Sequence, residues 1–318
     1  MKNTMCDDDI AVDERPFSKT IDHRYLPFSL AKRAIFLISI PVLGIFTTII
    51  LAFYNVLPTM VDFMAFLIMY LIAGLGMTVG YHRHFTHKAF KASKWVRRLF
   101  IITGSFCAQG TVISWVTMHR CHHKYSDQHD DPHSPYFKKS KKLTGVKKFW
   151  HSHIGWTFDY VVPNPIYYAR DLLRDPDVIR FSQYYYYWVL LGILLPGVVC
   201  GLICQSFLAG FTAVLWGGLI RLVVGANSLM AIASLTHMVG KKEFKTSDES
   251  RNIWWLSIFT FGESWHNNHH AFPASAKLGF EWWQLDLGGF VICLLEKLGL
   301  IWDVKQPSIE QRNSARFQ

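Results

Sequence analysis

Long stretches without charged side chains constrain this 318-residue chain more than any other feature. Residues 34–61 contain no charge, and after Asp62 a second such run continues to Gly80. About 20 apolar residues span the hydrocarbon core of a bilayer, so these runs predict transmembrane helices at about 34–57 and 63–81. Two later runs predict spans at about 187–208 and 211–236. We therefore expect an all-α integral membrane protein with four spans in two hairpins.

The charge distribution predicts which side of the membrane holds the rest of the chain. The formal net charge is +10, and the basic residues flank the apolar runs. The turns expected near 55–58 and near Gly210 contain no Lys or Arg. By the positive-inside rule, the basic segments and the histidines beside them are cytoplasmic. This placement favours an anionic membrane surface over a nucleic acid as the partner of the basic residues.

The ends of the chain and the cysteines add little to this organisation. Residues 1–30 form a polar N-terminal segment with no apparent signal peptide, residues 31–303 form the main domain, and residues 304–318 form a polar tail. The six cysteines include no C-x-x-C pair, so we expect reduced thiols. Arg221 lies deep in the fourth predicted span, and we expect it to have an ion-pair partner.

Histidines gather where the predicted spans end. The pattern H-x-x-H-H occurs at residues 119–123 and again at residues 266–270, and a third cluster contains His82, His84 and His87. On a helix, residues three and four apart lie on one face, so each box could share one or two metal ions. Residues 99–118 are moderately apolar, but a crossing there would separate the first two clusters. We therefore expect 99–118, like 279–302, to lie at the membrane interface.

Neutral imidazoles suit iron, zinc, copper and nickel, and the residues alone do not choose among these metals. The absence of H-E-x-x-H argues against a zinc protease. A metal transporter would place ligands inside the spans, whereas these histidines lie at span ends. A site with neutral ligands that a hydrocarbon chain can reach suits iron-based oxidation of an unactivated C–H bond.

These motifs resemble the membrane-bound fatty acyl desaturases, of the delta-9, stearoyl type and bacterial-like. The resemblance covers roughly residues 30–300 and extends to the residues around the boxes. It rests on these segments: Gly80-Tyr81-His82-Arg83, Phe85-Thr86-His87, Asp131-Pro132-His133-Ser134-Pro135, residues 150–156 (WHSHIGW) and residues 262–273 (GESWHNNHHAFP).

The resemblance implies a histidine-rich di-iron site in a cytoplasmic helical domain. Its nine ligands are His82, His87, His119, His122, His123, His237, His266, His269 and His270. The family has an Asn four residues before the isolated histidine, and here that position is Ala233. This departure leaves one iron without its usual water-mediated contact unless Asn227 or Ser234 replaces it.

The resemblance also implies roles for residues around this site. Gln109 matches a substrate-tunnel position, and Asp131 and Glu263 are expected to orient ligand imidazoles. The alternative for Gln109 is a helix-surface amide, and the alternative for Asp131 is a turn before Pro132. His84 is expected to remain outside the ligand set.

The implied reaction uses O₂ and two electrons to remove two hydrogens from neighbouring methylenes, giving water and a cis double bond, which the resemblance places at delta-9 of the acyl chain. The substrate is a fatty acyl-CoA or the acyl chain of a phospholipid. A separate electron donor, of ferredoxin or cytochrome type with its reductase, is required.

Gly110, Thr117 and Met118 stand where acyl-CoA enzymes carry polar and charged residues, which favours a bacterial inner membrane over the endoplasmic reticulum. A fatty acyl or alkane hydroxylase with the same metal site is the alternative.

Overall fold

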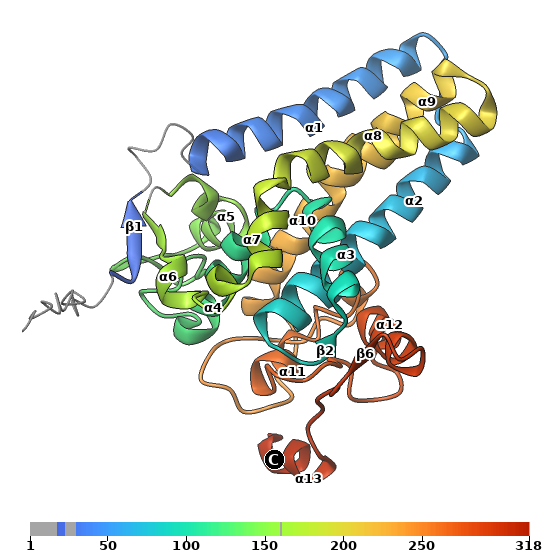
Figure 1. Cartoon of the computed structure of the whole chain (residues 1–318). Coiled ribbons are helices and arrows are strands. Elements are labelled where there is room, and N and C mark those ends of the chain that lie inside the picture. Colours follow the sequence, from blue (N-terminus) through green and yellow to red (C-terminus); the bar gives the residue numbers. More distant parts are fainter. Residues whose placement is uncertain (1–17, 23–29, 160, 318) are drawn as a thin grey trace, which may run out of the picture.

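The computed structural model describes residues 18–22, 30–159 and 161–317. The chain is mostly helical, and Figure 1 shows α1 (Leu30–Phe53), α2 (Met60–Leu75), α8 (Tyr185–Cys204) and α9 (Phe207–Ala213) extending away from the other helices. Within the described ranges, three helical stretches are long and apolar enough to cross a membrane: Met60–Thr86, Tyr185–Cys204 and Phe207–His237. The predicted helical, membrane-type fold is confirmed at this level. The first predicted span, in α1, and the orientation remain predictions.

The first hairpin turns between Phe53 and Met60. The Thr59 N–H donates to Asp62 Oδ2 at 2.7 Å, and the Thr59 hydroxyl accepts from the Asp62 N–H, which completes a capping box at the start of α2. Asp62, which interrupts the apolar sequence, therefore begins a helix. That helix continues beyond Leu75 as a π-helix over Gly76–Thr86.

The second hairpin is tightly packed. Helix α8 continues through Pro196, and a Cβ on Gly197 would lie 2.8 Å from the Gly210 carbonyl oxygen of α9. The chain then runs through a π-helix (Val214–Ile220), α10 (Arg221–Ser234) and a 3₁₀ turn (Leu235–His237). All four helices begin within four residues of the predicted spans.

The structure corrects the expected ion pair of Arg221. Its guanidinium is buried and donates to three backbone carbonyls: Phe106 O at 2.5 Å, Gly192 O at 3.0 Å and Gly217 O at 3.1 Å. No carboxylate among the described residues pairs with it. The expectation was wrong because backbone carbonyls can satisfy a buried cation as well: Phe106 caps the end of α3, and the Gly192 carbonyl lies four residues before Pro196, which has no N–H to donate to it.

The segment 99–118 is not one helix. It is divided between α3 (Lys94–Ser105) and α4 (Val112–Tyr125) by a loop in which Ala108 and Gly110 have φ angles of 56° and 100°. Helix α3 packs so closely on the π-helix that a Cβ on Gly80 would lie 2.6 Å from Phe100 Cβ. The main buried core joins these helices through side chains such as Tyr81, Phe100 and Val116.

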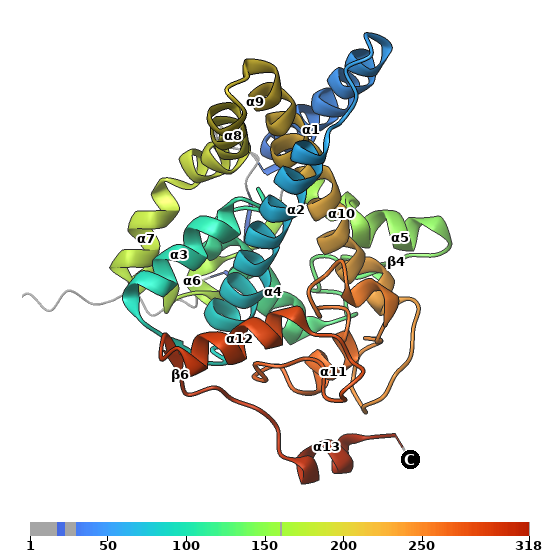
Figure 2. The ribbon, with the colours of Figure 1, turned by 90° about the vertical axis from the view of Figure 1, so that its right-hand side faces the viewer.

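Short elements complete the domain around the span ends. They are β2 (Lys91–Ala92), β3 (Phe137–Lys138), β4 (Lys141–Lys142), α5 (Val146–His153), a 3₁₀ turn (Gly155–Phe158), β5 (Val161–Pro163), α6 (Pro165–Tyr168), a 3₁₀ turn (Leu172–Arg174), α7 (Pro176–Gln183), a 3₁₀ turn (Trp255–Ser257), α11 (His266–Ala271), α12 (Leu287–Lys297), β6 (Ile301–Trp302) and α13 (Ile309–Ala315). Figure 2 shows α12 near the end of the α2 stretch, which it contacts.

Both polar ends take part in the fold. Most of the predicted N-terminal segment lies outside the described residues, but β1 (Thr20–Asp22) pairs antiparallel with β5. The predicted polar tail includes α13, and Arg316 beyond it pairs with Glu281.

Candidate metal centre

The first two histidines depend on the π-helix. Residues five apart in an α-helix point about 140° away from each other, so His82 and His87 would diverge on one. In the π-helix the His87 N–H donates to the His82 carbonyl at 3.2 Å, and this i to i+5 repeat brings the residues to one side. Their ring centroids lie 4.8 Å apart. The spacing H-x-x-x-x-H therefore becomes a pair of neighbouring imidazoles.

The other histidines come from regular helices and one helix end. The middle box lies on α4, as its spacing predicts, and the last box forms most of α11. His237 ends the 3₁₀ turn that follows α10 and has no exposed surface. The structure thus brings together residues separated by more than 180 positions.

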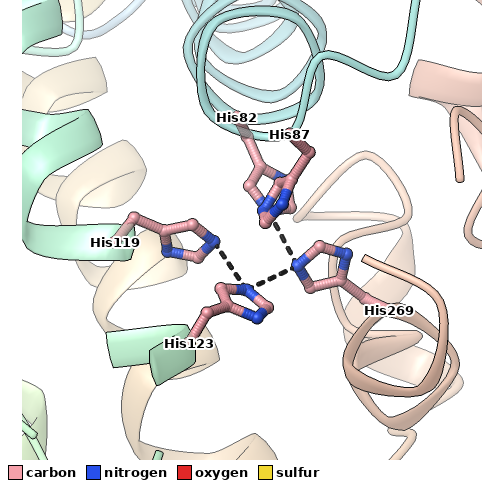
Figure 3. A group of neighbouring side chains, drawn as sticks. All are labelled: His82, His87, His119, His123 and His269. Carbon is pink, nitrogen blue, oxygen red and sulfur yellow. Dashed lines mark hydrogen bonds between the residues drawn. The ribbon is translucent and has the colours of Figure 1, made fainter. Parts of the chain in front are cut away.

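Among the described residues, the nine histidines predicted as ligands form two groups. The five-histidine group contains His82, His87, His119, His123 and His269, and the four-histidine group contains His122, His237, His266 and His270. In each group one ring nitrogen per residue lies within 4.8 Å of all the others. Figure 3 shows the imidazoles of the five-histidine group converging from three helices.

Nitrogen spacings in both groups are those of metal ligands. In the five-histidine group, the Nε2 atom of His269 lies 3.0 Å from that of His82 and 2.8 Å from that of His123. In the other, the Nε2 atoms of His237 and His266 are 3.0 Å apart. Imidazole nitrogens bound at right angles to one metal at about 2.1 Å would be about 3.0 Å apart. The donor sets therefore fit two metal ions.

Burial favours the neutral form, which is the form that binds metals, for several of these imidazoles. It lowers the pKa of His119, His123, His266 and His269 well below the usual range, and neighbouring histidines lower it further.

The two carboxylates singled out in the sequence contact ligand-type histidines. Both oxygens of Asp131 lie 3.1 Å from His122 Nδ1, and Glu263 Oε2 lies 2.6 Å from His82 Nδ1. Burial raises the pKa of Glu263, but its interactions with His82 and with the Arg83 guanidinium outweigh burial and leave that pKa at about 2. Both contacts place an acceptor opposite the nitrogen that faces the group, as an orienting partner requires.

Two further carboxylates of this kind were missed by the sequence analysis. Asp127 Oδ2 lies 2.9 Å from His237 Nδ1, and Asp248 Oδ2 lies 2.5 Å from His270 Nδ1. Burial opposes ionisation of Asp248, but its bond to His270 lowers the pKa of the carboxyl well below the usual range. The sequence offered only a general expectation, namely that each ligating imidazole needs an acceptor for its second N–H. This expectation does not identify the loop that provides the acceptor.

The other histidines in the described part of the chain lie outside the two groups. His84 Nδ1 is 3.1 Å from the Phe90 carbonyl oxygen, away from the groups, and His151 Nδ1 is 2.9 Å from that of Ser134. His133 stacks on His122, with ring centroids 4.3 Å apart. His153 contacts both residues considered as substitutes beside Ala233, namely Ser234 at 3.0 Å and Asn227 at 3.2 Å.

A largely apolar cavity of about 540 Å³ reaches both groups. Its lining includes His82 and His119 from one group and His122 and His266 from the other. Farther along it are apolar side chains such as Met77, Leu222 and Met230, together with Ala233 and Gln109. Gln109 is therefore part of the cavity wall. Its side-chain amide donates to the Cys107 carbonyl at 3.4 Å.

A second, polar opening of about 410 Å³ reaches different histidines. It is bounded by His87, His123 and His270, together with Arg120, Lys245 and the carboxylate of Asp248. The histidine groups can therefore be approached through an apolar cavity and through a polar one.

Comparisons with known proteins agree with this geometry. The sequence model of a family described as fatty acid desaturase matches residues 57–288. The chain is 41% identical over 297 residues to the hex-5-enoyl-[acyl-carrier protein] acetylenase of Moorena producens, which covers 92% of this chain and 91% of the relative. It is 40% identical over 246 residues to delta-9 acyl-lipid desaturase 1 of Arabidopsis thaliana, covering 77% and 76% of the two chains. It is 38% identical over 249 residues to the sn-1 stearoyl-lipid 9-desaturase of Synechocystis sp., covering 77% and 71%.

Proposed function

The chain belongs to the fatty acid desaturase family and is an oxidoreductase, and we propose that it introduces a cis double bond, at delta-9, into the acyl chain of a membrane lipid. The observation that carries this proposal is the apolar cavity that reaches both histidine groups. A saturated chain in that cavity would present its methylenes to the two metal positions.

The nine histidines would hold two iron ions, five residues at one and four at the other. When bound, this pair of ions supplies the oxidising capacity that removes hydrogen from an unactivated methylene, with O₂ as the oxidant and two electrons from a separate donor. The polar opening beside His87, His123 and His270 supports an approach to the histidines for this donor, of ferredoxin or cytochrome type.

The protein's own residues position the chain and the ligands. Apolar side chains bind the methylenes and exclude water, and the cavity wall determines which carbons lie beside the histidines. Gln109 would contact the chain from that wall. Asp131 and Glu263 would hold the second nitrogens of His122 and His82 as acceptors, which orients both rings.

The residues described along the cavity support a lipid rather than a coenzyme A ester. They include Asp159 and neutral polar side chains, but no Lys or Arg among the described lining residues. The phosphates of coenzyme A would need cations there. We further propose that α1 is a fourth span and that the histidine side is cytoplasmic in a bacterial inner membrane, because the basic segments lie on that side.

Expression in a host that lacks its own desaturase tests the proposal. The fatty acids of its phospholipids should gain cis-monounsaturated chains with the natural protein, and none with the His122→Ala variant at equal membrane abundance. Mass spectrometry of derivatised chains would locate the double bond. Hydroxylated chains would instead establish the hydroxylase alternative. Unchanged lipids, with both metals bound and a competent donor present, would contradict the proposal.

The similarity to an acetylenase supports a second candidate. The same removal of two hydrogens, applied to a chain that already has a double bond, gives a triple bond. Feeding the host a saturated and a terminally unsaturated acid in parallel separates the two activities. Alkynyl product from the second acid alone would make acetylenic oxidation the principal function.

A further inference from the structure

A buried chain of charged groups runs from His82 to the start of α12. Glu263, whose Oε2 faces His82, accepts at Oε1 from Arg83 Nε and Nη2, both at 3.1 Å. Arg83 donates in turn to Asp286, from Nη2 to Oδ1 at 2.8 Å and from Nη1 to Oδ2 at 3.1 Å. The side chains of Arg83, Glu263 and Asp286 are only 1%, 5% and 7% exposed. These contacts are therefore little screened by solvent.

Backbone groups fix the far end of this chain. Asp286 is the N-cap of α12, and its Oδ1 accepts from the Gly289 N–H at 2.8 Å. Its Oδ2 accepts from the Leu278 N–H at 2.7 Å and the Gly279 N–H at 3.3 Å. Backbone N–H groups bind both carboxylate oxygens of Asp286. They therefore fix the carboxylate in the one orientation in which it accepts from Arg83.

Glycines make room for this ion pair. A Cβ on Gly288 would lie 2.8 Å from Arg83 Nη2, and one on Gly289 would lie 2.5 Å from Asp286 Oδ2. Gly262 has a φ of +99°, and a Cβ there would lie 2.3 Å from Asp286 Oδ1. The backbone thus approaches Arg83 and Asp286 closely at all three glycines.

We propose that Arg83 and Asp286 are positioning residues of the five-histidine group and act on it through Glu263. Asp286 holds Arg83 and balances its charge, so that Glu263 remains free to accept from the Nδ1–H of His82. With Asp286 neutral, the whole charge of Arg83 would act on Glu263 and draw its carboxylate away from His82. This inference rests on the proposed function, because it assumes that His82 binds metal.

The Asp286→Asn variant separates this role from helix capping. Asn caps helices about as well as Asp, so α12 keeps its cap at Gly289, while the ion pair and the bonds from the Leu278 and Gly279 N–H groups are lost. Loss of an outer partner of a metal ligand typically lowers metal affinity about 10–100-fold. We expect a loss of that size in the purified protein, measured by cobalt(II) titration against a competing chelator, together with a changed cobalt absorption spectrum. Glu296→Ala, an exposed position on the same helix, is the control and should match the natural protein.

Two further variants distinguish the proposed role of Asp286 from a general effect on folding. Gly288→Ala leaves Asp286 unchanged, but its added methyl group would contact the Arg83 guanidinium. The same features of the cobalt absorption spectrum should therefore change. Combining Asp286→Asn with Glu263→Gln should lower cobalt affinity no more than Glu263→Gln alone, because both changes act through one contact. A purely structural role of Asp286 would give additive losses.

Unchanged cobalt affinity and spectrum in Asp286→Asn, or additive losses in the double variant, would overturn the proposal. Failure of the proposed function is visible separately, because a natural protein that binds two metals but forms no unsaturated chains would contradict desaturation alone. A natural protein that binds no metal would contradict both.

Discussion

The two histidine groups differ in how their imidazoles are held. In the five-histidine group, the contacts of the described residues give one imidazole, His82, a carboxylate partner. In the four-histidine group they give three such partners: Asp131 to His122, Asp127 to His237 and Asp248 to His270. A carboxylate opposite the bound nitrogen makes an imidazole a stronger donor. The group with fewer nitrogens is thus supported by more negative charge.

The two groups share α4 and α11 and differ in their third element. The five-histidine group adds the π-helix, and ring packing helps to orient it, as where Trp115 stacks on His119 with centroids 4.9 Å apart. The four-histidine group adds His237 from the 3₁₀ turn after α10, and two of its carboxylate partners, Asp127 and Asp248, lie in irregular segments. Loop placement therefore contributes more to the four-histidine group.

Removing a ligand from either group should have the largest effect and shows whether the groups bind metal separately. His87→Ala and His122→Ala should each lower the iron content from two ions to one per chain, measured by elemental analysis. Product formation should fall by more than about 100-fold, beyond the loss expected for an outer partner. His84→Ala should retain both ions, because its ring contacts the Phe90 carbonyl. An iron content of two ions per chain in His122→Ala would contradict the assignment of one metal ion to each histidine group.

Asp248→Asn should weaken the four-histidine group alone. Without the carboxylate, His270 is a poorer donor and less well oriented, so metal affinity there should fall roughly 10–100-fold. Metal retained per chain at increasing chelator concentration would show one ion leaving early. The neighbouring Glu249→Gln, which removes a partly exposed acid that pairs with Lys242 and Arg251, serves as the control. Equal retention in the two variants would mean that the extra carboxylates do not distinguish the groups.

Ala233→Asn should strengthen the four-histidine group by a smaller amount. Ala233 lines the cavity together with His122 and His266, and an amide there adds a hydrogen-bonding group. One such group contributes about 1 kcal/mol, or roughly fivefold in affinity. Ala226→Asn, two turns earlier on α10 and also in the cavity wall, controls for the added volume. If both variants changed metal retention alike in the chelator assay, position 233 would have no special relation to this group.

The smallest change is expected for Trp115→Phe, which tests ring packing in the five-histidine group. A phenyl ring can still lie over His119 but covers less of it, so we expect a loss near 0.5 kcal/mol, or roughly twofold in cobalt affinity. Trp254→Phe at an exposed position should have no effect. A loss as large as that of Asp248→Asn would show that packing orients this group as strongly as a carboxylate orients the other.

Local patterns in the chain were sufficient for much of this architecture. The uncharged runs located four helices to within four residues at their starts, because the hydrocarbon thickness of a membrane fixes the length of a span. The spacing H-x-x-H-H required one helical face, and both boxes are helical. Those boxes and the residues around them also identified the family.

Other features depend on how distant segments dock. His122 and His123 are adjacent in the chain, yet they enter different groups, and no periodicity distinguishes them. The π-helix that aligns His82 with His87, the carbonyls that receive Arg221, and the approach of Asp127 and Asp248 also arise from tertiary packing. Local spacing determines which side chains share a face, whereas the packing of helices far apart in sequence determines which of them meet.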